Sequence, residues 1–227
     1  DLFNGHFFSI RFRMDIVSGY AEPVNTDPYG KLSLEPCMGA KPQDLSKTDW
    51  IAAAFRALVS GGPSAINVEP LAKSLSVTKG SFYWHFKDRA ALHTAMLDHW
   101  EKIATDHIID DVEARGGSGR TKLERLINHA VSAAPDAYGG AQAEGVLRGW
   151  AASYGPAGAI LARVDKRRRA YLAQLFQEAG LDKAGARHAA DIAYLASIGA
   201  QATRATGGKI DRPSTWTHLL DKLLGEN

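Results

Sequence analysis

The residues with the clearest chemistry lie in the segment VTKGSFYWHF, which runs from Val77 to Phe86. It joins two hydroxyl side chains and a lysine to four aromatic rings and a histidine. Hydroxyl groups, a long cation and the polar tips of tyrosine and histidine can donate hydrogen bonds to phosphate oxygens, and a lysine can also reach a base edge. The charged residues from Val77 to Lys87 are Lys79 and Lys87, both basic. This local patch suits a polyanionic partner, although the whole chain carries a net charge of only +2.

The elements that position this segment read as three short helices. Ser46 predicts an N-cap, with Asp49 three residues later as in a capping box, and a Gly-Gly-Pro sequence at 61–63 ends the first helix. Asn67 can cap a second helix and, after a short link, Thr78 can cap a third. Two short helices joined by three or four residues form a helix-turn-helix, whose second helix enters the DNA major groove.

The aromatic residues of the third helix divide between core and surface. Helical spacing predicts that Phe82 and Phe86 are core, since aromatic residues at such spacing are buried more often than not. Tyr83 and His85 fall on other sides of the helix and are interpreted as DNA contacts, while Trp84 suits either role. Gly80 lacks a side chain, which lets the helix approach DNA closely, although glycine lowers helix propensity by about 1 kcal/mol.

The rest of the chain also reads as helical, which predicts an all-α fold. A long amphipathic stretch from Lys87 ends at the GGSG sequence of 116–119. Further helices are expected at 120–133, 141–153, 157–179, 183–205 and 214–224. Residues 1–45 contain four prolines that break every period, and we expect an extended or disordered arm there.

Composition narrows the class of protein. The single cysteine, Cys37, excludes an intrachain disulfide and fits a cytoplasmic protein, and no apolar run reaches the roughly 18–20 residues of a membrane span. His99 and His107 lie eight positions apart, whereas paired metal ligands on a helix usually lie four apart. We therefore expect no metal site and no cofactor.

The stretch NVEPLAKSLSVTKGSFYWHFKDRAAL resembles the signature of the tetracycline-repressor (TetR) family of bacterial transcription regulators. The resemblance covers roughly residues 48–97. It implies a DNA-binding domain at 46–90 and a larger helical domain at 91–227 for ligand sensing and dimerisation. Ser76 stands where the family's turn usually has glycine, which predicts strain if the turn needs a positive φ. By position, the resemblance places at the DNA Asn67, Thr78, Lys79, Gly80, Ser81, Tyr83, Trp84, His85 and Lys87.

The resemblance implies that the segments 157–179 and 183–205 make the homodimer. The second segment is rich in small residues, which permit the close helix packing that a four-helix bundle requires. The alternative is that both segments are simply the chain's own core. The KRRR run at 166–169 reads as a solvated face. Candidate ligand-binding residues are the aromatic and histidine side chains of the sensing domain: Trp100, His107, His129, Tyr138, Tyr154 and, as the strongest single candidate, Trp150.

The function that these patterns favour is a ligand-responsive dimeric regulator. We expect a repressor that a small-molecule effector releases from a palindromic operator on double-stranded DNA. The alternatives are a helical enzyme or a protein-interaction module that begins with a similar motif. An enzyme is disfavoured because the chain has no nucleophile elbow, HExxH, phosphate-binding glycine loop or CxxC.

Overall fold

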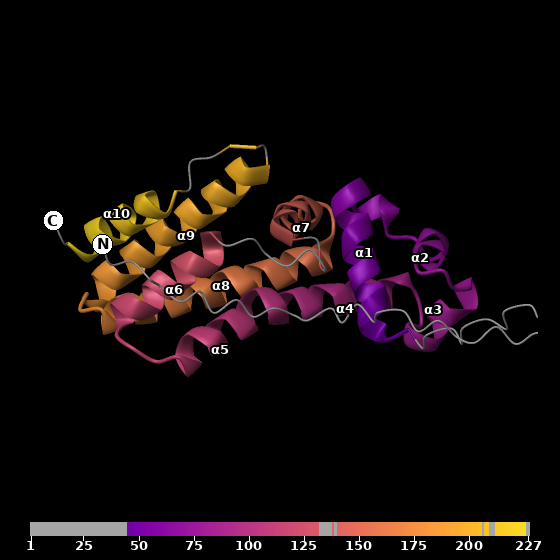
Figure 1. The fold of residues 1–227 in the computed structure, drawn as a ribbon, viewed down its shortest axis with the longest axis horizontal. Helices are drawn as coiled ribbons and strands as arrows, with labels where there is room; N and C mark the ends of the chain where they lie inside the picture. The colour runs from indigo at the N-terminus through magenta and orange to yellow at the C-terminus, as the bar shows by residue number, and fades with distance from the viewer. Residues whose placement is uncertain (1–44, 132–137, 139, 206, 209–211, 226–227) are drawn as a thin grey trace, which may run out of the picture. The chain divides into compact units, whose positions relative to one another are not determined.

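The computed structural model describes residues 45–131, 138, 140–205, 207–208 and 212–225. Within them every regular element is a helix, which confirms the all-α prediction (Figure 1). The expected arm at 1–45 lies almost wholly outside the described residues. The elements are α1 Lys47–Gly61, 3₁₀ turn η1 Pro63–Ala65, α2 Val68–Ser74, α3 Lys79–His85, α4 Arg89–Glu101, π-helix η2 Lys102–Asp106, α5 His107–Ala114, α6 Gly119–Val131, 3₁₀ turn η4 Gly140–Gln142, α7 Ala143–Ala151, α8 Gly155–Glu178, α9 Lys183–Ala205 and α10 Pro213–Leu224.

The start of α1 is the capping box that the sequence predicts. The Asp49 amide donates to Ser46 Oγ at 3.2 Å, and the Ser46 amide donates to Asp49 Oδ2 at 2.8 Å. Hydrogen bonds from the Ser46 side chain and backbone hold the pKa of the Asp49 carboxyl below its ordinary value. The aspartate, although shorter than glutamate, completes the box.

The starts of α2 and α3 differ from the expectation. Asn67 and Thr78 occupy the N-cap positions, but neither side chain makes a capping hydrogen bond. Asn67 Nδ2 instead donates to the Ser64 carbonyl, and Asn67 Oδ1 accepts from Arg89 Nη1 at 3.0 Å. The expectation of side-chain capping was therefore wrong at both helices, and Asn67 joins the start of α2 to the start of α4.

The turn between α2 and α3 carries the strain that the sequence predicts. Ser76 has φ of 56°, the one non-glycine residue with positive φ in the described chain. The turn closes through the Val77 amide, which donates to the Ala72 carbonyl at 3.0 Å. A serine therefore holds a left-handed conformation that glycine adopts at lower cost.

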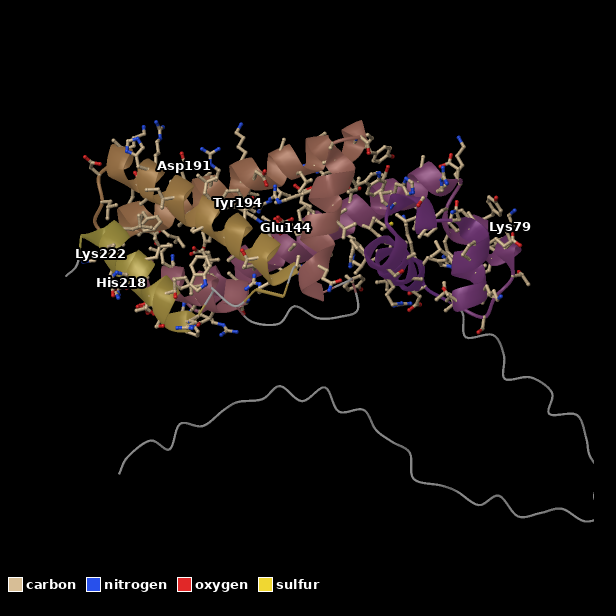
Figure 2. The ribbon with its side chains drawn as sticks, turned by 90° about the horizontal axis from the view of Figure 1, so that it is seen from above. Lys79, Glu144, Asp191, Tyr194, His218 and Lys222 are labelled. Atoms are coloured by element: carbon tan, nitrogen blue, oxygen red, sulfur yellow. The ribbon has the colours of Figure 1, made fainter. Side chains whose placement is uncertain are left out.

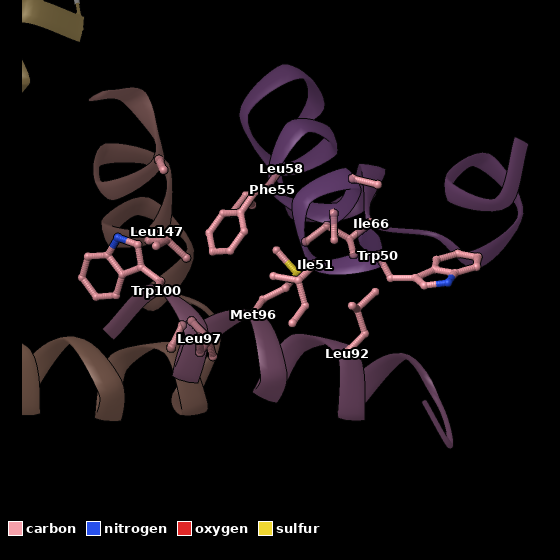
Figure 3. Close-up of a cluster of buried hydrophobic side chains, with 14 of the residues drawn as sticks. Trp50, Ile51, Phe55, Leu58, Ile66, Leu92, Met96, Leu97, Trp100 and Leu147 are labelled. Atoms are coloured by element: carbon pink, nitrogen blue, oxygen red, sulfur yellow. The ribbon is translucent and has the colours of Figure 1, made fainter. Parts of the chain in front are cut away.

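One hydrophobic core holds the helix-turn-helix on the helices that follow (Figure 3). Trp50, Phe55 and Leu58 of α1 are fully buried, and they share this core with Met96 of α4 and Leu147 of α7. The core continues to the start of α8. Buried side chains thus cross the expected border at residue 90, and the division at that position stays a prediction.

Helices α4, η2 and α5 follow one another without a break and appear as one long helix in Figure 1. The sequence predicts this length, but the π-helical turn at Lys102–Asp106 was not expected. A π turn widens the helix and leaves the regular ladder of backbone hydrogen bonds, and such turns are often found at functional sites. A second core lies farther along the chain, where α8 and α9 pack along each other and α5, α6 and α10 contribute Val112, Leu123 and Leu220.

Candidate nucleic-acid interface and internal cavity

Helix α3 separates a buried side from an exposed one within consecutive residues. Phe82 is fully buried, with its ring 5.3 Å from that of Trp50 in an edge-on arrangement, and it stacks on Phe86 at 5.4 Å. Tyr83 is 56% exposed and Trp84 is 89% exposed. Two aromatic side chains therefore face outward where burial would be the ordinary outcome, and their exposure needs a reason beyond the fold.

The other residues that the resemblance places at DNA lie around this exposed side. Lys79 lies at the end of the molecule formed by the helix-turn-helix (Figure 2). Its side chain, like those of Tyr83 and His85, makes no hydrogen bond or ion pair with another described residue. The exposed side of α3 therefore offers hydrogen-bond donors that have no partner among the described residues, next to aromatic rings. The exposed members are Thr78, Lys79, Gly80 and Lys87, and the half-buried ones are Asn67, Ser81 and His85.

A cavity of about 610 Å³ lies among the helices that follow the helix-turn-helix. Its wall is formed by η2, by the adjoining parts of α4 and α5, and by helices α6 to α10. Ile103, Ala104 and Thr105 of the π-helical turn line it. The volume is within the range of about 300–1,000 Å³ that is typical of pockets for drug-sized ligands.

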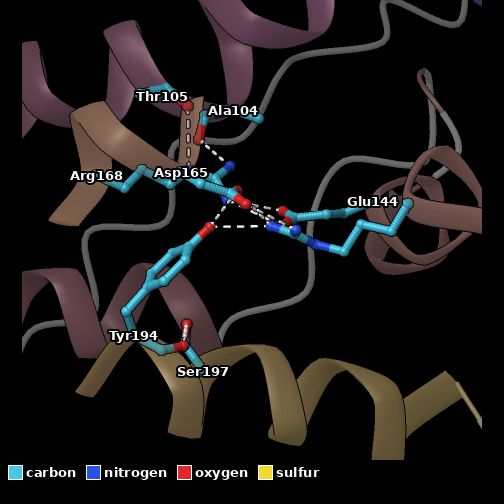
Figure 4. Close-up of polar contacts among 8 residues, drawn as sticks. Ala104, Thr105, Glu144, Asp165, Arg168, Tyr194 and Ser197 are labelled. Carbon is cyan, nitrogen blue, oxygen red and sulfur yellow. Dashed lines mark hydrogen bonds and ion pairs between the residues drawn. The ribbon is translucent and has the colours of Figure 1, made fainter. Parts of the chain in front are cut away.

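Glu144, Arg168 and Tyr194 line this cavity, and hydrogen bonds join them to Arg148 and Asp165 (Figure 4). We call these five side chains the Glu144 cluster. Arg168 Nη1 donates to both Glu144 oxygens at 2.9 and 3.0 Å, while its Nη2 donates to the Ala104 carbonyl at 2.8 Å. Its Nε donates to Thr105 Oγ1 at 3.1 Å. Arg168 therefore ties the π-helical turn to α7, which carries Glu144.

Arg148 completes the cluster from α7. Its guanidinium donates to Glu144 Oε1 and to both Asp165 oxygens, and the Tyr194 hydroxyl donates to Asp165 Oδ1 at 2.6 Å. Burial raises the pKa of the Tyr194 hydroxyl to about 12, and its hydrogen bond to Asp165 acts in the same direction. Burial alone would raise the pKa of Asp165, but the bonds from Arg148 and Tyr194 outweigh it and hold that pKa below its ordinary value. At neutral pH Tyr194 is a protonated donor to an ionised carboxylate.

The structure divides the candidate ligand-binding residues between two places. Trp100, His107, His129 and Tyr138 line the 610 Å³ cavity. His129 Nε2 also lies 3.0 Å from Asp111 Oδ2, and that hydrogen bond is the main cause that lowers the pKa of Asp111.

Trp150 and Tyr154 do not line that cavity. They line a second one of about 530 Å³, next to the start of α4. Their rings stack at 4.7 Å, and the buried ring of His93 meets Trp150 edge-on at 4.9 Å. Burial lowers the pKa of His93, and the Arg89 charge adds to the effect. The strongest candidate from the sequence, Trp150, thus packs against α4 instead of the larger cavity.

Sequence reasoning missed the Glu144 cluster. The KRRR run at 166–169 was expected to be a solvated face, and this was wrong for Arg168, whose side chain is 17% exposed. The signal available in the sequence was weak. Glu144 and Arg148 are four residues apart, so they share one face of α7, but their partners on α8 and α9 are fixed only by tertiary packing.

The described residues include no helix that is long and apolar enough to cross a bilayer. They also hold no group of three or more histidine, cysteine, aspartate or glutamate side chains arranged to bind a metal ion.

Residues 51–96 match the family model described as "Bacterial regulatory proteins, tetR family". No curated protein sequence matches the chain.

Solved structures extend the likeness beyond the matched segment. A putative transcriptional regulator from Pseudomonas aeruginosa PAO1 is similar with a TM-score of 0.67 and 16% identity, over 82% of this chain and 93% of that one. A putative TetR-family regulator from a Rhodococcus species gives a TM-score of 0.59 and 22% identity over 78% and 96%. A putative regulator from Saccharomonospora viridis, solved in complex with choline, gives 0.64 and 14% over 80% and 96%.

These structures share their fold with most of this chain, and the family model covers α1 to α4, the part that carries the exposed side of α3. Residues 51–96, which contain the helix-turn-helix, thus match the TetR family of bacterial regulatory proteins, and the described chain shares its fold with solved transcriptional regulators.

Proposed function

We propose that the protein is a dimeric cytoplasmic repressor that releases a palindromic operator when a small molecule fills the 610 Å³ cavity, and that it has no catalytic activity. The observation that carries the proposal is the exposed side of α3, where Lys79, Tyr83 and Trp84 surround a helix whose Phe82 is buried. Thr78, Ser81, His85 and Lys87 adjoin this side, and Asn67 occupies the N-cap position of α2. We assign these residues and Gly80 to the DNA contact.

The ligand response is supported by the position of the cavity. Its wall includes the π-helical turn of the long helix, and α4 at the other end of that helix packs on α1. A ligand that contacts Ile103, Ala104 or Thr105 therefore touches the element that carries the helix-turn-helix. It must favour the state that does not bind DNA, and couplings of this kind are typically about 1–3 kcal/mol. The choline bound to the Saccharomonospora viridis regulator is consistent with effector binding in this fold.

Dimerisation is supported by the outer side of α9. Ile192 is 49% exposed and Leu195 is 70% exposed, and Gly199 lies on the same side one turn later. The opposite side of α9 packs in the chain's own core through Ala186, Ala189 and Ala190. These small residues therefore pack within the chain, while Ile192 and Leu195 on the outer side of α9 are apolar and exposed in the monomer.

The experiment that tests the function is selection of duplexes from a random DNA library with the full chain, followed by footprinting. We expect one enriched sequence with two half-sites about 10 base pairs apart, since a two-fold dimer reads one helical turn. Tyr83→Ala and Trp84→Ala should abolish enrichment, while His218→Ala, an exposed aromatic truncation on α10, should leave it intact. Failure to enrich any duplex would contradict the proposal.

A further inference from the structure

The charged side chains in the wall of the 610 Å³ cavity already have partners. Glu144 and Arg168 are bonded to each other, and Arg148 and Asp165 complete the Glu144 cluster behind them. The cluster contains two guanidinium groups and two carboxylates, so its charges cancel. His129 is paired with Asp111, and Arg204 has an interaction partner as well. Glu144, the one carboxylate in the described wall, thus has a partner of opposite charge, as do Arg168 and His129, while His107 is an exposed imidazole of the wall.

These ion pairs in the cavity wall determine which charge a bound ligand can carry. A charged ligand would either lose its hydration without gaining an opposite charge or break a buried ion pair, and both are unfavourable. A cationic ligand meets a further obstacle, because the Arg168 guanidinium already lies 5.4 Å from the centre of the Trp100 ring and occupies that aromatic face. Only an uncharged molecule fills the cavity without either cost.

Apolar side chains make up most of the cavity wall next to α10. Leucine and phenylalanine side chains line it, namely Leu123, Leu126, Phe176, Leu219, Leu220 and Leu223. Trp216 lines it too, and its Nε1 is buried without a hydrogen-bond partner among the described residues. A buried N–H without an acceptor is costly, so a ligand that brings an acceptor gains a hydrogen bond there.

We propose that the effector is an uncharged, mainly apolar molecule of drug-like size with one hydrogen-bond acceptor, such as a hydroxyl, carbonyl or ether oxygen, that reaches Trp216 Nε1. The inference rests on the proposed function, because it takes this cavity as the effector site. It separates the chain from the choline-bound regulator of Saccharomonospora viridis, whose ligand is a cation.

The first test uses three probes of equal chain length on the wild-type protein without DNA: decan-1-ol, decanoate and decyltrimethylammonium. Trp100 and Trp216 line the cavity, so tryptophan fluorescence reports occupancy, and calorimetry gives the Kd. The Kd of decanol should be lower by roughly tenfold or more than that of either ion, because an ion must be buried without a partner. The proposal is overturned if either ion binds as tightly as decanol, or if none of the probes binds.

The second test compares two identical substitutions. Trp216→Phe removes the indole N–H in the cavity, while Trp50→Phe removes another buried indole N–H without a partner, which lies in the helix-turn-helix core. Trp216→Phe should weaken decanol binding roughly three- to tenfold, the effect of one hydrogen bond. Trp50→Phe should change it less than twofold. If wild type and Trp216→Phe bound decanol with equal affinity, and circular dichroism showed both proteins folded, the proposed hydrogen bond from Trp216 Nε1 to the ligand would be refuted.

The outcomes distinguish this inference from the proposed function. A protein that binds a selected duplex but prefers a charged probe, or binds none, refutes the ligand class alone. A protein that binds decanol with the expected preference but enriches no duplex refutes the proposed function and leaves the chemistry of the cavity in place.

Discussion

Within α3, Phe82 is buried whereas the next two residues, Tyr83 and Trp84, are exposed, because a short helix packs on its neighbours by one side only. Phe82 and Phe86 are predicted as core from their spacing, and the structure confirms both. The sequence left open whether Trp84 is buried or exposed. In the structure it is exposed, more so than Tyr83. Spacing decides the buried residues well, since it fixes the side of a helix on which each residue lies.

The capping expectations show where single residues escape prediction. Ser46 and Asp49 form their box within one turn, so the sequence contains the whole interaction. Asn67 has an equally suitable side chain, but its oxygen accepts from Arg89, 22 residues later. A local sequence pattern cannot predict a hydrogen-bond partner that only the tertiary fold brings close.

Gly80 provides a prediction at this scale. A Cβ added there would lie 3.6 Å from Thr78 Oγ1, an ordinary contact, so Gly80→Ala should stabilise the protein by about 0.5–1 kcal/mol through helix propensity. Its affinity for a selected duplex should nevertheless fall several-fold, because the added methyl meets the DNA. Urea unfolding and fluorescence anisotropy measure the two effects.

Gly149→Ala is the matched control, because a Cβ at this position of α7 meets nothing within 4 Å. It should raise stability in the same way and leave DNA affinity unchanged. If Gly80→Ala bound DNA as tightly as Gly149→Ala, close approach of the α3 backbone to DNA would be wrong.

At the scale of elements, the long helix from Arg89 to Ala114 is predicted in length but not in detail. Its apolar positions indicate a continuous helix, and the GGSG sequence correctly ends it. Within the π-helical turn, the Ala104 carbonyl accepts a hydrogen bond from Arg168, 64 positions farther along the chain. No period in the sequence contains that information.

The buried histidines of α4 give this element a dependence on pH. Burial lowers the pKa of both His93 and His99 from the ordinary value of 6.5. The charge of Arg89 lowers the pKa of His93 further, and the charges of His107 and Lys102 lower that of His99 further. Below pH 6.5 the unfolded chain therefore takes up protons that the folded chain does not. Their contribution to stability is complete above that pH and is lost as the pH falls toward the folded-state pKa values.

We expect the free energy of unfolding in urea to fall between pH 7.5 and 5.5, by at most about 1.4 kcal/mol per pH unit for each histidine. His93→Gln should reduce this slope, even if it lowers stability at pH 7.5. His218→Gln, at an exposed position of α10, should not. An unchanged slope in His93→Gln would show that His93 takes up its proton equally in both states.

At the scale of the whole molecule, the all-α fold and nearly all helix boundaries follow from apolar periodicity and from glycine and proline punctuation. The cavity does not. Trp100, His107 and His129 line it and Trp150 does not, although the residue types are equally suitable. Which aromatic side chain faces a void depends on how α7 is rotated against α4 and α8, and many contacts distant in sequence determine that rotation.

The proposed dimer is tested at this scale. Leu195→Glu places a charge on the uncovered side of α9, where the leucine is 70% exposed in the monomer. The monomer should fold as before, but sedimentation should show loss of the dimer, since a charge is unfavourable in the core of an interface. Trp84→Glu, at an even more exposed aromatic residue, should remain dimeric. A dimer that survives Leu195→Glu would place the interface elsewhere.

The most direct test of the account is the salt dependence of binding to a selected duplex, measured for wild type, Lys79→Ala and Lys183→Ala. Lys79 and Lys183 are both exposed, but only Lys79 lies on α3. The affinity of the wild type should fall steeply as salt rises, and Lys79→Ala should reduce the slope of log K against log salt by roughly 1, as for one lost phosphate contact. Lys183→Ala should keep the wild-type slope. An identical slope in Lys79→Ala and wild type, or binding that does not respond to salt, would contradict a DNA contact through the exposed side of α3.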